Sequence, residues 1–278
     1  MAAYGMPFSW RCNGGIITLN LELSGNDRLN DLKTALASDE TCIGVWCSLA
    51  NPLSTEVVAG SGADWLLIDG EHSPNDLRSI VVQLQAVAAY PLEPMVRLPS
   101  DDVNLIKQFM DGGARSLMIP NVRSAEQARQ IVRATRYAPD GVRGFSMAHR
   151  ANRFGRIQGY HATAHAHVLL ALQIECAEGV ANAAEIAAVE GVDALFIGPG
   201  DLSTNLDAMG NPAAEHVQDA IRHVIDTARA AGKAAGILAP VKTDADRYID
   251  WGCRLVAVGS DLGLLAKYTD GLVASFKV

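Results

Sequence analysis

Short apolar segments alternate with longer amphipathic segments from residue 43 to the end of the chain. Runs of four to seven mostly apolar residues without strict alternation are typical of strands that are buried on both faces, as in parallel sheets. Eight such runs predict eight strands, at 43–47, 65–69, 94–98, 116–119, 168–174, 193–197, 234–238 and 254–258.

The segments between these runs have the spacing of helices. In 75–90, for example, apolar residues recur every three or four positions, which puts them on one helical face. Similar patterns predict helices at 102–110, 124–137, 179–190, 213–231 and 242–251. Alternation of eight strands with helices over roughly 230 residues predicts a (β/α)8 barrel of the TIM type. An open doubly wound sheet is the alternative, but no GxGxxG motif follows a first strand.

Two segments depart from this regularity. Residues 1–40 lack the alternation, and we interpret them as an N-terminal extension with a helix near 29–36, leaving 41–278 as the barrel domain. Residues 138–167 form an unusually long connection, and long connections inside a compact domain are often functional. Its histidines, His161, His165 and His167, have metal-like spacing, but no Asp, Glu or Cys lies near them.

Composition narrows the class of protein. The 278 residues carry 23 Lys and Arg against 31 Asp and Glu, a formal charge of −8 that disfavours nucleic acid as a partner. No apolar run reaches the roughly 18 residues of a membrane helix, so we expect no membrane partner. Five scattered cysteines and no secretory signal predict a reduced, cytoplasmic protein.

Chemically active side chains follow four of the predicted strands. Asp69 ends the second strand and His72 follows it, Arg97 lies at the end of the third, Glu175 follows the fifth and Asp201 follows the sixth. The active site of such a barrel lies where strands end and the following loops begin. We therefore expect these five side chains to meet at one rim.

Each of these residues also has a purely structural alternative. Glu175 and Asp201 are candidate ligands of Mg²⁺ or Mn²⁺ through their carboxylate oxygens, but either also suits a helix start. Arg97 suits a substrate carboxylate or enolate oxygen, or else a structural ion pair. His72 suits acid–base chemistry, or else a hydrogen-bonded loop.

Two further features bear on the chemistry. The turn 198–200 has the sequence Gly-Pro-Gly and exposes backbone amides that favour an anion, although the turn alone is weak support. None of the six lysines ends a strand, whereas a Schiff-base aldolase needs a buried rim lysine. The lysine distribution therefore favours metal-assisted over imine chemistry.

Taken together, these segments resemble the HpcH/HpaI aldolase family of metal-dependent class II pyruvate aldolases, which includes 4-hydroxy-2-oxoheptanedioate aldolase. The resemblance spans 43–278 in order and leaves 1–40 uncovered. It is carried by WLLIDGEHSPND (65–76), MVRLPS (95–100), FMDGGARSLMIPNV (109–122), ATRYAPDGVRG (134–144), LQIE (172–175), GVDALFIGPGDLS (191–203), GKAAGIL (232–238) and VAVGSDLGLL (256–265).

The resemblance implies a modified barrel of the phosphoenolpyruvate/pyruvate-domain type. Its last helix is exchanged between subunits of a homohexamer built as a trimer of dimers. It also implies a divalent cation, Mg²⁺ or Mn²⁺ with Co²⁺ as a further candidate. Pyruvate and an aldehyde are the implied substrates.

Roles for individual residues follow from the same resemblance. Glu175 and Asp201 are implied as the metal ligands, and Arg97 as the group that holds the pyruvate oxygens. The amides of Gly200 and Asp201 are expected to bind the pyruvate carboxylate, although many members carry Ala at position 200. The other implied site residues are Gln173 as a polar contact, Asp69 in the pocket, His72 oriented by Asp111 across a subunit interface, and Trp46 and Leu238 on the aldehyde side.

The expected reaction is formation of a pyruvate enolate and its reversible addition to an aldehyde, which in reverse cleaves a 4-hydroxy-2-oxo acid. Related enolate reactions are alternatives, namely decarboxylation of oxaloacetate or a specialised C–C condensation. A non-catalytic oligomeric binding protein is a third reading, which the complete set of site residues disfavours. The aldehyde is not identified, and we expect 138–167, Trp46 and Leu238 to select it.

Overall fold

The computed structural model describes residues 8–12, 15–19 and 30–277. The part of the extension at 1–7, 13–14 and 20–29 lies outside the described residues. Two strands of the extension, β1 (Phe8–Cys12) and β2 (Gly15–Leu19), form an antiparallel hairpin that is separate from the main sheet.

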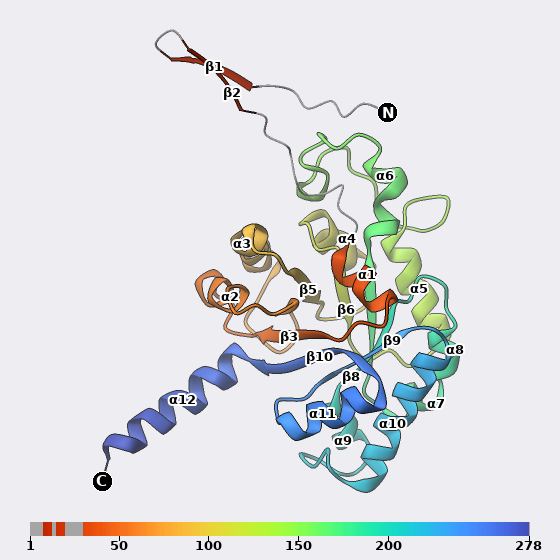
Figure 1. The fold of residues 1–278 in the computed structure, drawn as a ribbon. Coiled ribbons are helices and arrows are strands. Elements are labelled where there is room, and N and C mark those ends of the chain that lie inside the picture. The colour runs from red at the N-terminus through yellow and green to blue at the C-terminus, as the bar shows by residue number, and fades with distance from the viewer. Residues whose placement is uncertain (1–7, 13–14, 20–29, 278) are drawn as a thin grey trace.

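The main sheet is a closed barrel of parallel strands in the order β10-β3-β4-β5-β6-β7-β8-β9 (Figure 1). Closure is decided by β10, which pairs with β9 on one side and β3 on the other. The predicted (β/α)8 barrel is therefore confirmed, and the open doubly wound alternative was wrong. All eight predicted strands are present, as β3 (Cys42–Cys47), β4 (Trp65–Asp69), β5 (Glu93–Arg97), β6 (Ser116–Ile119), β7 (Leu169–Ile174), β8 (Ala194–Ile197), β9 (Ala234–Leu238) and β10 (Cys253–Ser260).

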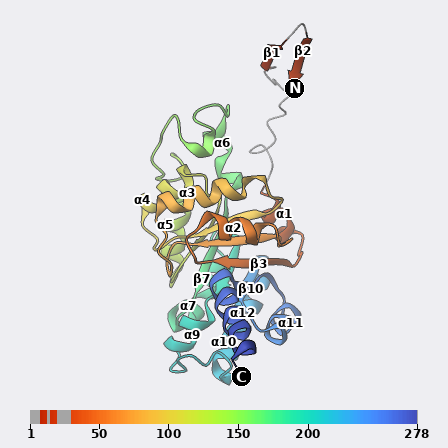
Figure 2. The same ribbon diagram turned by 90° about the vertical axis from the view of Figure 1, so that its left-hand side faces the viewer.

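Helices surround the barrel and cover the outward faces of its strands (Figures 1 and 2). The α-helices are α1 (Asp31–Ala37), α2 (Pro52–Ala59), α3 (Leu77–Ala86), α4 (Val103–Asp111), α5 (Ala125–Thr135), α6 (Tyr160–Thr163), α7 (Ala177–Ala181), α8 (Ala183–Ala187), α9 (Pro199–Asn205), α10 (Glu215–Ala230), α11 (Lys242–Trp251) and α12 (Asp261–Phe276). Three short 3-10 helices are η1 (Val87–Ala89), η2 (Arg150–Asn152) and η3 (Ala164–His167). The helix predicted at 179–190 is two helices in the structure, because the chain turns at Asn182.

The period-two alternation of each strand decides which side chains enter the barrel. In β4, Leu66 and Ile68 face the helices, whereas Trp65 and Leu67 belong to the interior cluster. Asp69 continues the inward series. The same alternation turns one residue inward near the ends of β3, β5, β7 and β9. These residues are Trp46, Arg97, Gln173 and Leu238.

The opposite, N-terminal end of the barrel is closed by α1, close to where the sequence predicts a helix at 29–36. Leu32 is buried against the interior cluster, and the side chain of Asn30 donates to the hydroxyl of Ser116 at 2.7 Å. Lys33 forms an ion pair with Asp193 at 2.9 Å. Residues 30–37 of the proposed extension therefore pack on the barrel.

The long connection after α5 also lies at this N-terminal end. It precedes β7, and the guanidinium of Arg143 bonds to Asp111 at 2.6 Å, while that of Arg150 donates to the carbonyl of Gly112 at 2.9 Å. Both partners stand at the C-terminal end of α4, which runs back from the catalytic rim. Within its own chain the connection thus does not line that rim.

Helix α12 projects away from the barrel (Figures 1 and 2). Its first residue, Asp261, is buried and accepts the backbone amide of Ser48 at 2.8 Å. Beyond this anchor the helix exposes large apolar side chains, among them Leu265, Tyr268 and Phe276 at 58%, 72% and 81%. None of the helices in the described part of the chain has the length and apolar character needed to span a membrane.

Candidate active site

An ion pair between Asp69 and Arg97 is the centre of the catalytic rim. The guanidinium donates from Nε to Oδ1 at 2.9 Å and from Nη2 to Oδ2 at 2.8 Å. Asp69 and Arg97 are paired in the register of β4 and β5, at the ends of these two strands, so strand pairing brings them together. The Arg97 guanidinium holds the pKa of Asp69 below its ordinary value against the opposing effect of burial. The structural ion pair considered for Arg97 is therefore formed.

The indole of Trp46 also contacts this pair. Its Nε1 donates to Oδ2 of Asp69 at 3.2 Å, and its ring lies 5.0 Å from the guanidinium carbon of Arg97. A cation over an indole face is attracted by the ring quadrupole. Trp46 therefore fixes both members of the pair and forms one wall of the rim.

Glu71 is a site residue that sequence reasoning missed. Its Oε2 lies 2.9 Å from Nη1 of Arg97, and burial raises the pKa of this carboxyl despite that cation. It stands two residues after a strand-end aspartate, in the segment DGEH, so its place in the loop after β4 was a usable signal. With Asp69 occupying Nε and Nη2, Glu71 faces the edge of Arg97 that is left for a ligand.

Glu175 lies on the far side of the rim at the end of β7. Its Oε2 accepts the side-chain amide of Gln173 at 2.5 Å. A Cβ at Gly198 would lie 2.5 Å from that same oxygen, so only glycine leaves room for the carboxylate. Burial, with the nearby carboxylates of Glu71 and Asp201, raises the pKa of Glu175 to about 7. Cys176 caps the following helix, which removes the helix-start alternative for Glu175.

Asp201 lies in the first turn of α9, directly after the Gly198-Pro199-Gly200 turn. In the part of the chain that the structure describes, no side chain caps this helix. The first amides of a helix have no intrahelical acceptor, so the amides of Gly200 and Asp201 stand at the rim as donors. A Cβ at Gly200 would meet nothing within 4 Å, so the exchange of Ala for Gly leaves the turn unchanged.

The charges at this rim suit a divalent cation. Glu71, Glu175 and Asp201 act electrostatically on one another, and one guanidinium faces them. Among the described residues no three His, Cys, Asp or Glu side chains are placed to chelate a metal together. Two carboxylates with open positions are nevertheless the usual protein share of an Mg²⁺ site, which water and substrate oxygens complete. The donor set therefore fits the implied cation.

His72 and Asp111, which were expected to act together, lie apart in this chain. The side chain of His72 is 65% exposed at the catalytic rim, with Nε2 3.9 Å from Oε2 of Glu71. Asp111 ends α4 at the other end of the barrel, where it bonds to Arg143 and lies 3.8 Å from Nε2 of His149. Contact between His72 and Asp111 therefore requires a second copy of the chain.

The remaining predicted residues are placed as follows. Leu238 ends β9 and is partly buried against the interior cluster, near the rim. The Oε1 of Gln173 is buried and has no hydrogen-bond partner among the described residues, so it is an open acceptor beside Glu175. His161 bonds to the carbonyl of Ser146 at 3.0 Å within the long connection.

Comparisons with known proteins identify relatives of this chain. The chain is 52% identical over 237 residues to a hydroxypyruvate/pyruvate aldolase of Delftia acidovorans, covering 85% of this chain and 88% of the relative. It is 46% identical over 248 residues to a 5-keto-4-deoxy-D-glucarate aldolase of Escherichia coli, covering 89% of this chain and 97% of the relative.

A solved structure from Burkholderia cenocepacia, described as an HpcH/HpaI aldolase/citrate lyase family protein, superposes with a TM-score of 0.87. It is 39% identical, with 90% of this chain and all of that chain covered. The model of the HpcH/HpaI aldolase/citrate lyase family matches residues 42–267. The chain therefore belongs to the HpcH/HpaI aldolase/citrate lyase family.

Proposed function

We propose that this protein is a divalent-metal-dependent aldolase that forms the enolate of pyruvate and adds it reversibly to an aldehyde. Family membership and its aldolase relatives make the chain a carbon–carbon lyase. The observation that carries the metal-dependent mechanism is the surplus of carboxylates at the rim, where Glu71, Glu175 and Asp201 face Arg97.

Glu175 and Asp201 would hold Mg²⁺ or Mn²⁺, with Co²⁺ as a further candidate. Such a cation polarises a carbonyl oxygen and neutralises the negative charge that develops when a proton leaves the adjacent carbon. The raised pKa of Glu175 means that its carboxylate is costly to ionise without a cation. A bound cation would remove that cost, so the raised pKa of Glu175 supports a metal ion beside this carboxylate.

The protein's own donors would orient the 2-oxo acid. Asp69 occupies Nε and Nη2 of Arg97, and Nη1 lies 2.9 Å from Oε2 of Glu71, so Nη1 would donate to the keto oxygen as well as to Glu71 or in its place. The amides of Gly200 and Asp201 would bind the carboxylate. Both donor sets are fixed before the reaction, so little reorganisation accompanies charge development.

His72 would move the proton. In the cleavage direction it accepts the proton of the C4 hydroxyl, directly or through a water, as the C3–C4 bond breaks and the electron pair passes to the enolate. The released aldehyde leaves, and C3 then takes up a proton to give pyruvate. His72 is exposed and lies near the Glu71 carboxylate, so it reaches substrate at the rim. Asp111 of a second copy would hold the imidazole in orientation.

The names of the relatives suggest the substrate class. One is a hydroxypyruvate/pyruvate aldolase and another a 5-keto-4-deoxy-D-glucarate aldolase. We infer that the acceptor is a short hydroxylated aldehyde, with Trp46 and Leu238 shaping its side of the pocket. The long connection, at the far end of its own barrel, would take part in this selection only at the rim of a neighbouring copy.

The active form would be a homo-oligomer with two kinds of contact. Helix α12 offers a large exposed apolar face, which a second copy would cover in a dimer. Contact of the Asp111 end of one barrel with the His72 rim of another joins unlike surfaces, and such contacts close into rings. A hexamer built as a trimer of dimers satisfies both requirements.

The decisive experiment is turnover of 5-keto-4-deoxy-D-glucarate, with pyruvate detected enzymatically, before and after exhaustive chelation. We expect activity with Mg²⁺ or Mn²⁺ and less than one hundredth of it in excess EDTA, and retained turnover in EDTA would refute the metal part. Parallel assays with oxaloacetate, and with pyruvate plus a panel of aldehydes, measure the competing enolate reactions. Faster decarboxylation than aldol cleavage would overturn the aldolase assignment.

Oligomerisation is tested by light scattering on the wild type and on Leu265→Asp, which puts a charge on the exposed face of α12. We expect a hexamer for the wild type and smaller species for the variant. Lys267→Asp, which also adds negative charge to α12 but replaces no apolar side chain, is the control for charge alone. A wild-type monomer with full activity would contradict both the oligomer and the role of Asp111.

A further inference from the structure

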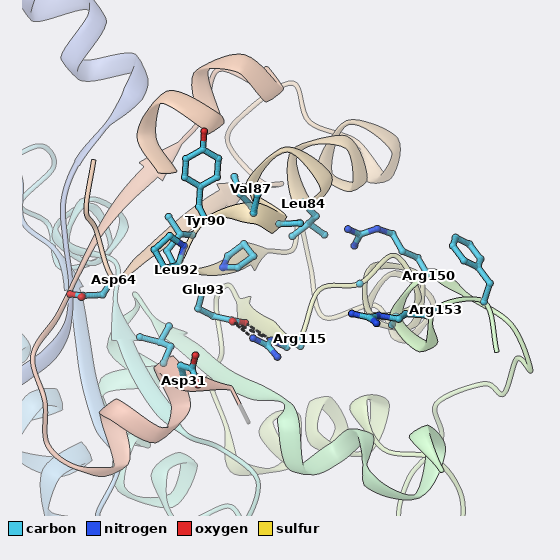
Figure 3. Close-up of a pocket in the computed structure, with 18 of the residues that line it drawn as sticks. Asp31, Asp64, Leu84, Val87, Tyr90, Leu92, Glu93, Arg115, Arg150 and Arg153 are labelled. Carbon is cyan, nitrogen blue, oxygen red and sulfur yellow. Dashed lines mark hydrogen bonds and ion pairs between the residues drawn. The ribbon is translucent and has the colours of Figure 1, made fainter. Parts of the chain in front are cut away.

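A second cavity lies at the N-terminal end of the barrel, away from the catalytic rim (Figure 3). Its volume is about 890 Å³, within the range of small-molecule sites. It is bounded by the start of α1, the connection from η1 to β5, the residues before β6, and η2 with the residues after it. All of these segments belong to the end of the barrel at which the strands begin.

The two sides of this cavity differ in character. The connection into β5 contributes an apolar wall that includes Leu84, Val87, Tyr90 and Leu92. Four arginine side chains also line the cavity, namely Arg115, Arg150, Arg153 and Arg156. In Figure 3 Arg150 and Arg153 lie on the side of the cavity away from Asp31 and Asp64.

Arg150 is the residue whose charge is not balanced there. Its Nη1 donates to the carbonyl of Gly112 at 2.9 Å, and in the described part of the chain no carboxylate forms an ion pair with it. Burial alone shifts its pKa, downward. A half-buried guanidinium without a counter-ion is costly, and an anion in the cavity would offset that cost.

The acidic residues of the cavity are, by contrast, engaged elsewhere. Glu93 is held by Arg115 at 2.6 Å and by the hydroxyl of Ser116 at 2.7 Å. Asp64 accepts the backbone amide of Ile43 at 2.7 Å. Asp31 lies in the first turn of α1, where a negative charge is favoured by the helix dipole. These carboxylates therefore leave the Arg150 side positive.

The backbone around Arg150 is shaped to keep it in place. Gly113 has φ +106°, and a Cβ there would lie 2.2 Å from Nη1 of Arg150, so only glycine permits this position. Arg153 and Phe154 both have left-handed φ values, 52° and 58°. Bulky residues rarely adopt this conformation, and such strain gathers at functional sites.

We propose that this cavity binds a small phosphate monoester, with the phosphoryl group on Arg150 and an apolar body against Leu84, Val87 and Tyr90. Guanidinium groups on one wall favour a dianion with several acceptor oxygens over a monocarboxylate. The volume and the apolar wall favour an ester over free phosphate. The site lies apart from the rim residues of its own chain, although Gly112 and Gly113 directly follow Asp111, and its test is a binding measurement that does not depend on the proposed reaction.

Calorimetry with three probes tests the proposal on the full-length protein. We expect phenyl phosphate to bind in the micromolar to millimolar range, at least tenfold more tightly than inorganic phosphate or benzoate. Equal binding of phenyl phosphate and inorganic phosphate would overturn the role of the apolar wall. If no binding of phenyl phosphate is detected at concentrations up to about 10 mM, the proposed site is refuted.

Variants then place the site. Arg150→Gln should weaken phenyl phosphate at least tenfold. Gly113→Ala should do the same, because the added Cβ displaces the guanidinium. Arg129→Gln, which removes an exposed arginine paired with Glu126 on α5, is the matched control and should change binding less than twofold. If Arg150→Gln and Arg129→Gln weaken phenyl phosphate binding equally, the effect comes from the net charge of the protein and the site is refuted.

Folding of each variant is checked by circular dichroism and by its thermal unfolding midpoint, which should lie close to those of the wild type. If Arg150→Gln does not fold, the salt dependence of wild-type binding and an Arg150→Lys variant replace it. Lys keeps the charge but loses the planar fork, and we expect a weakening of about three- to tenfold. Binding that is unchanged in Arg150→Lys and independent of salt would contradict the proposal.

Discussion

The two ends of the barrel both carry buried or half-buried charges, but they balance them differently. At the N-terminal end the buried acid Glu93 pairs with Arg115, and the partly buried Asp193 pairs with Lys33. At the C-terminal end Asp69 takes two edges of Arg97, and Glu71, Glu175 and Asp201 share what is left. Balanced pairs hold the barrel together, whereas the unbalanced set is ready to bind a cation and an oxyanion.

Arg150, by contrast, is a half-buried cation at the N-terminal end for which no ion-pair partner is found among the described residues. The uncompensated charge is therefore negative at the C-terminal rim and positive at Arg150. Surplus carboxylates indicate a cation site at the rim, and a surplus guanidinium indicates an anion site below it. Charge balance, rather than the number of charged residues, distinguishes functional from structural clusters in this molecule.

The largest expected effect comes from removing Arg97. Arg97→Ala should lower kcat by about 10²–10³-fold, because a preorganised donor to the developing oxyanion is lost. It should also destabilise the protein by about 3–5 kcal/mol, because Asp69 is left buried and unpaired. Arg115→Ala at the other end should cost stability, by about 1–3 kcal/mol, and leave kcat within twofold. Steady-state kinetics with denaturant titration separates the two, and a matching loss of kcat in Arg115→Ala would break the comparison.

Removal of a rim carboxylate should act mainly on the metal. We expect Glu175→Gln to weaken Mg²⁺ or Mn²⁺ binding by at least about 30-fold, about 2 kcal/mol, because the amide carries no charge to attract the cation. Asp193→Asn, at the N-terminal end, should leave metal affinity unchanged. Titration of Mn²⁺ followed by electron paramagnetic resonance measures both. Unaltered Mn²⁺ affinity in Glu175→Gln would remove Glu175 from the ligand set.

The raised pKa of Glu175 predicts opposite pH trends for the metal-free and metal-bound protein. A folded-state pKa of about 7, above its ordinary value of 4.5, means that the folded state holds this proton more tightly than the unfolded chain. The resulting stabilisation is complete below about pH 4.5 and is lost as pH rises toward 7.

Metal binding must displace this proton, so metal affinity should rise about tenfold per pH unit up to pH 7 and then level off. Calorimetry of Mg²⁺ binding between pH 5.5 and about 8.5 measures the slope. The slope should vanish in Glu175→Gln, and a flat profile in the wild type would assign the titration to another group.

The smallest effect is expected at Trp46. Trp46→Phe keeps a ring near Arg97 but removes the N–H that donates to Asp69. The loss of one hydrogen bond to a charged group predicts a decrease in kcat/KM of about 10-fold, corresponding to about 1.5 kcal/mol. Trp65→Phe, at a wholly interior position of the same barrel, should lower stability without this kinetic effect. A larger loss of kcat/KM in Trp46→Phe than in Arg97→Ala would contradict the assignment of Arg97 as the more important of the two residues.

Several features of the site followed from the sequence because they depend on local pattern. The continuous apolar runs predicted all eight strands, and the residues after them predicted Arg97, Glu175 and Asp201 as rim residues. Glu71 was missed although its place in the segment DGEH, two residues after a strand-end aspartate, was a usable signal, because an acidic loop residue by itself is more often exposed to solvent. The last helix was predicted from the family resemblance and is present as α12, but the apolar pattern gave no bounds for it.

The sequence by itself determined the class of fold and the chemistry available, since strand length, burial and residue type are properties of short segments. Only the tertiary structure decided how charges pair. The register of β4 and β5 places Asp69 where it accepts two N–H groups of Arg97, those of Nε and Nη2. Helix α4 runs antiparallel to the strands and carries Asp111 to the end of the barrel opposite His72. Such pairings join residues that lie far apart in the chain, and their free energy depends on distance and burial in three dimensions.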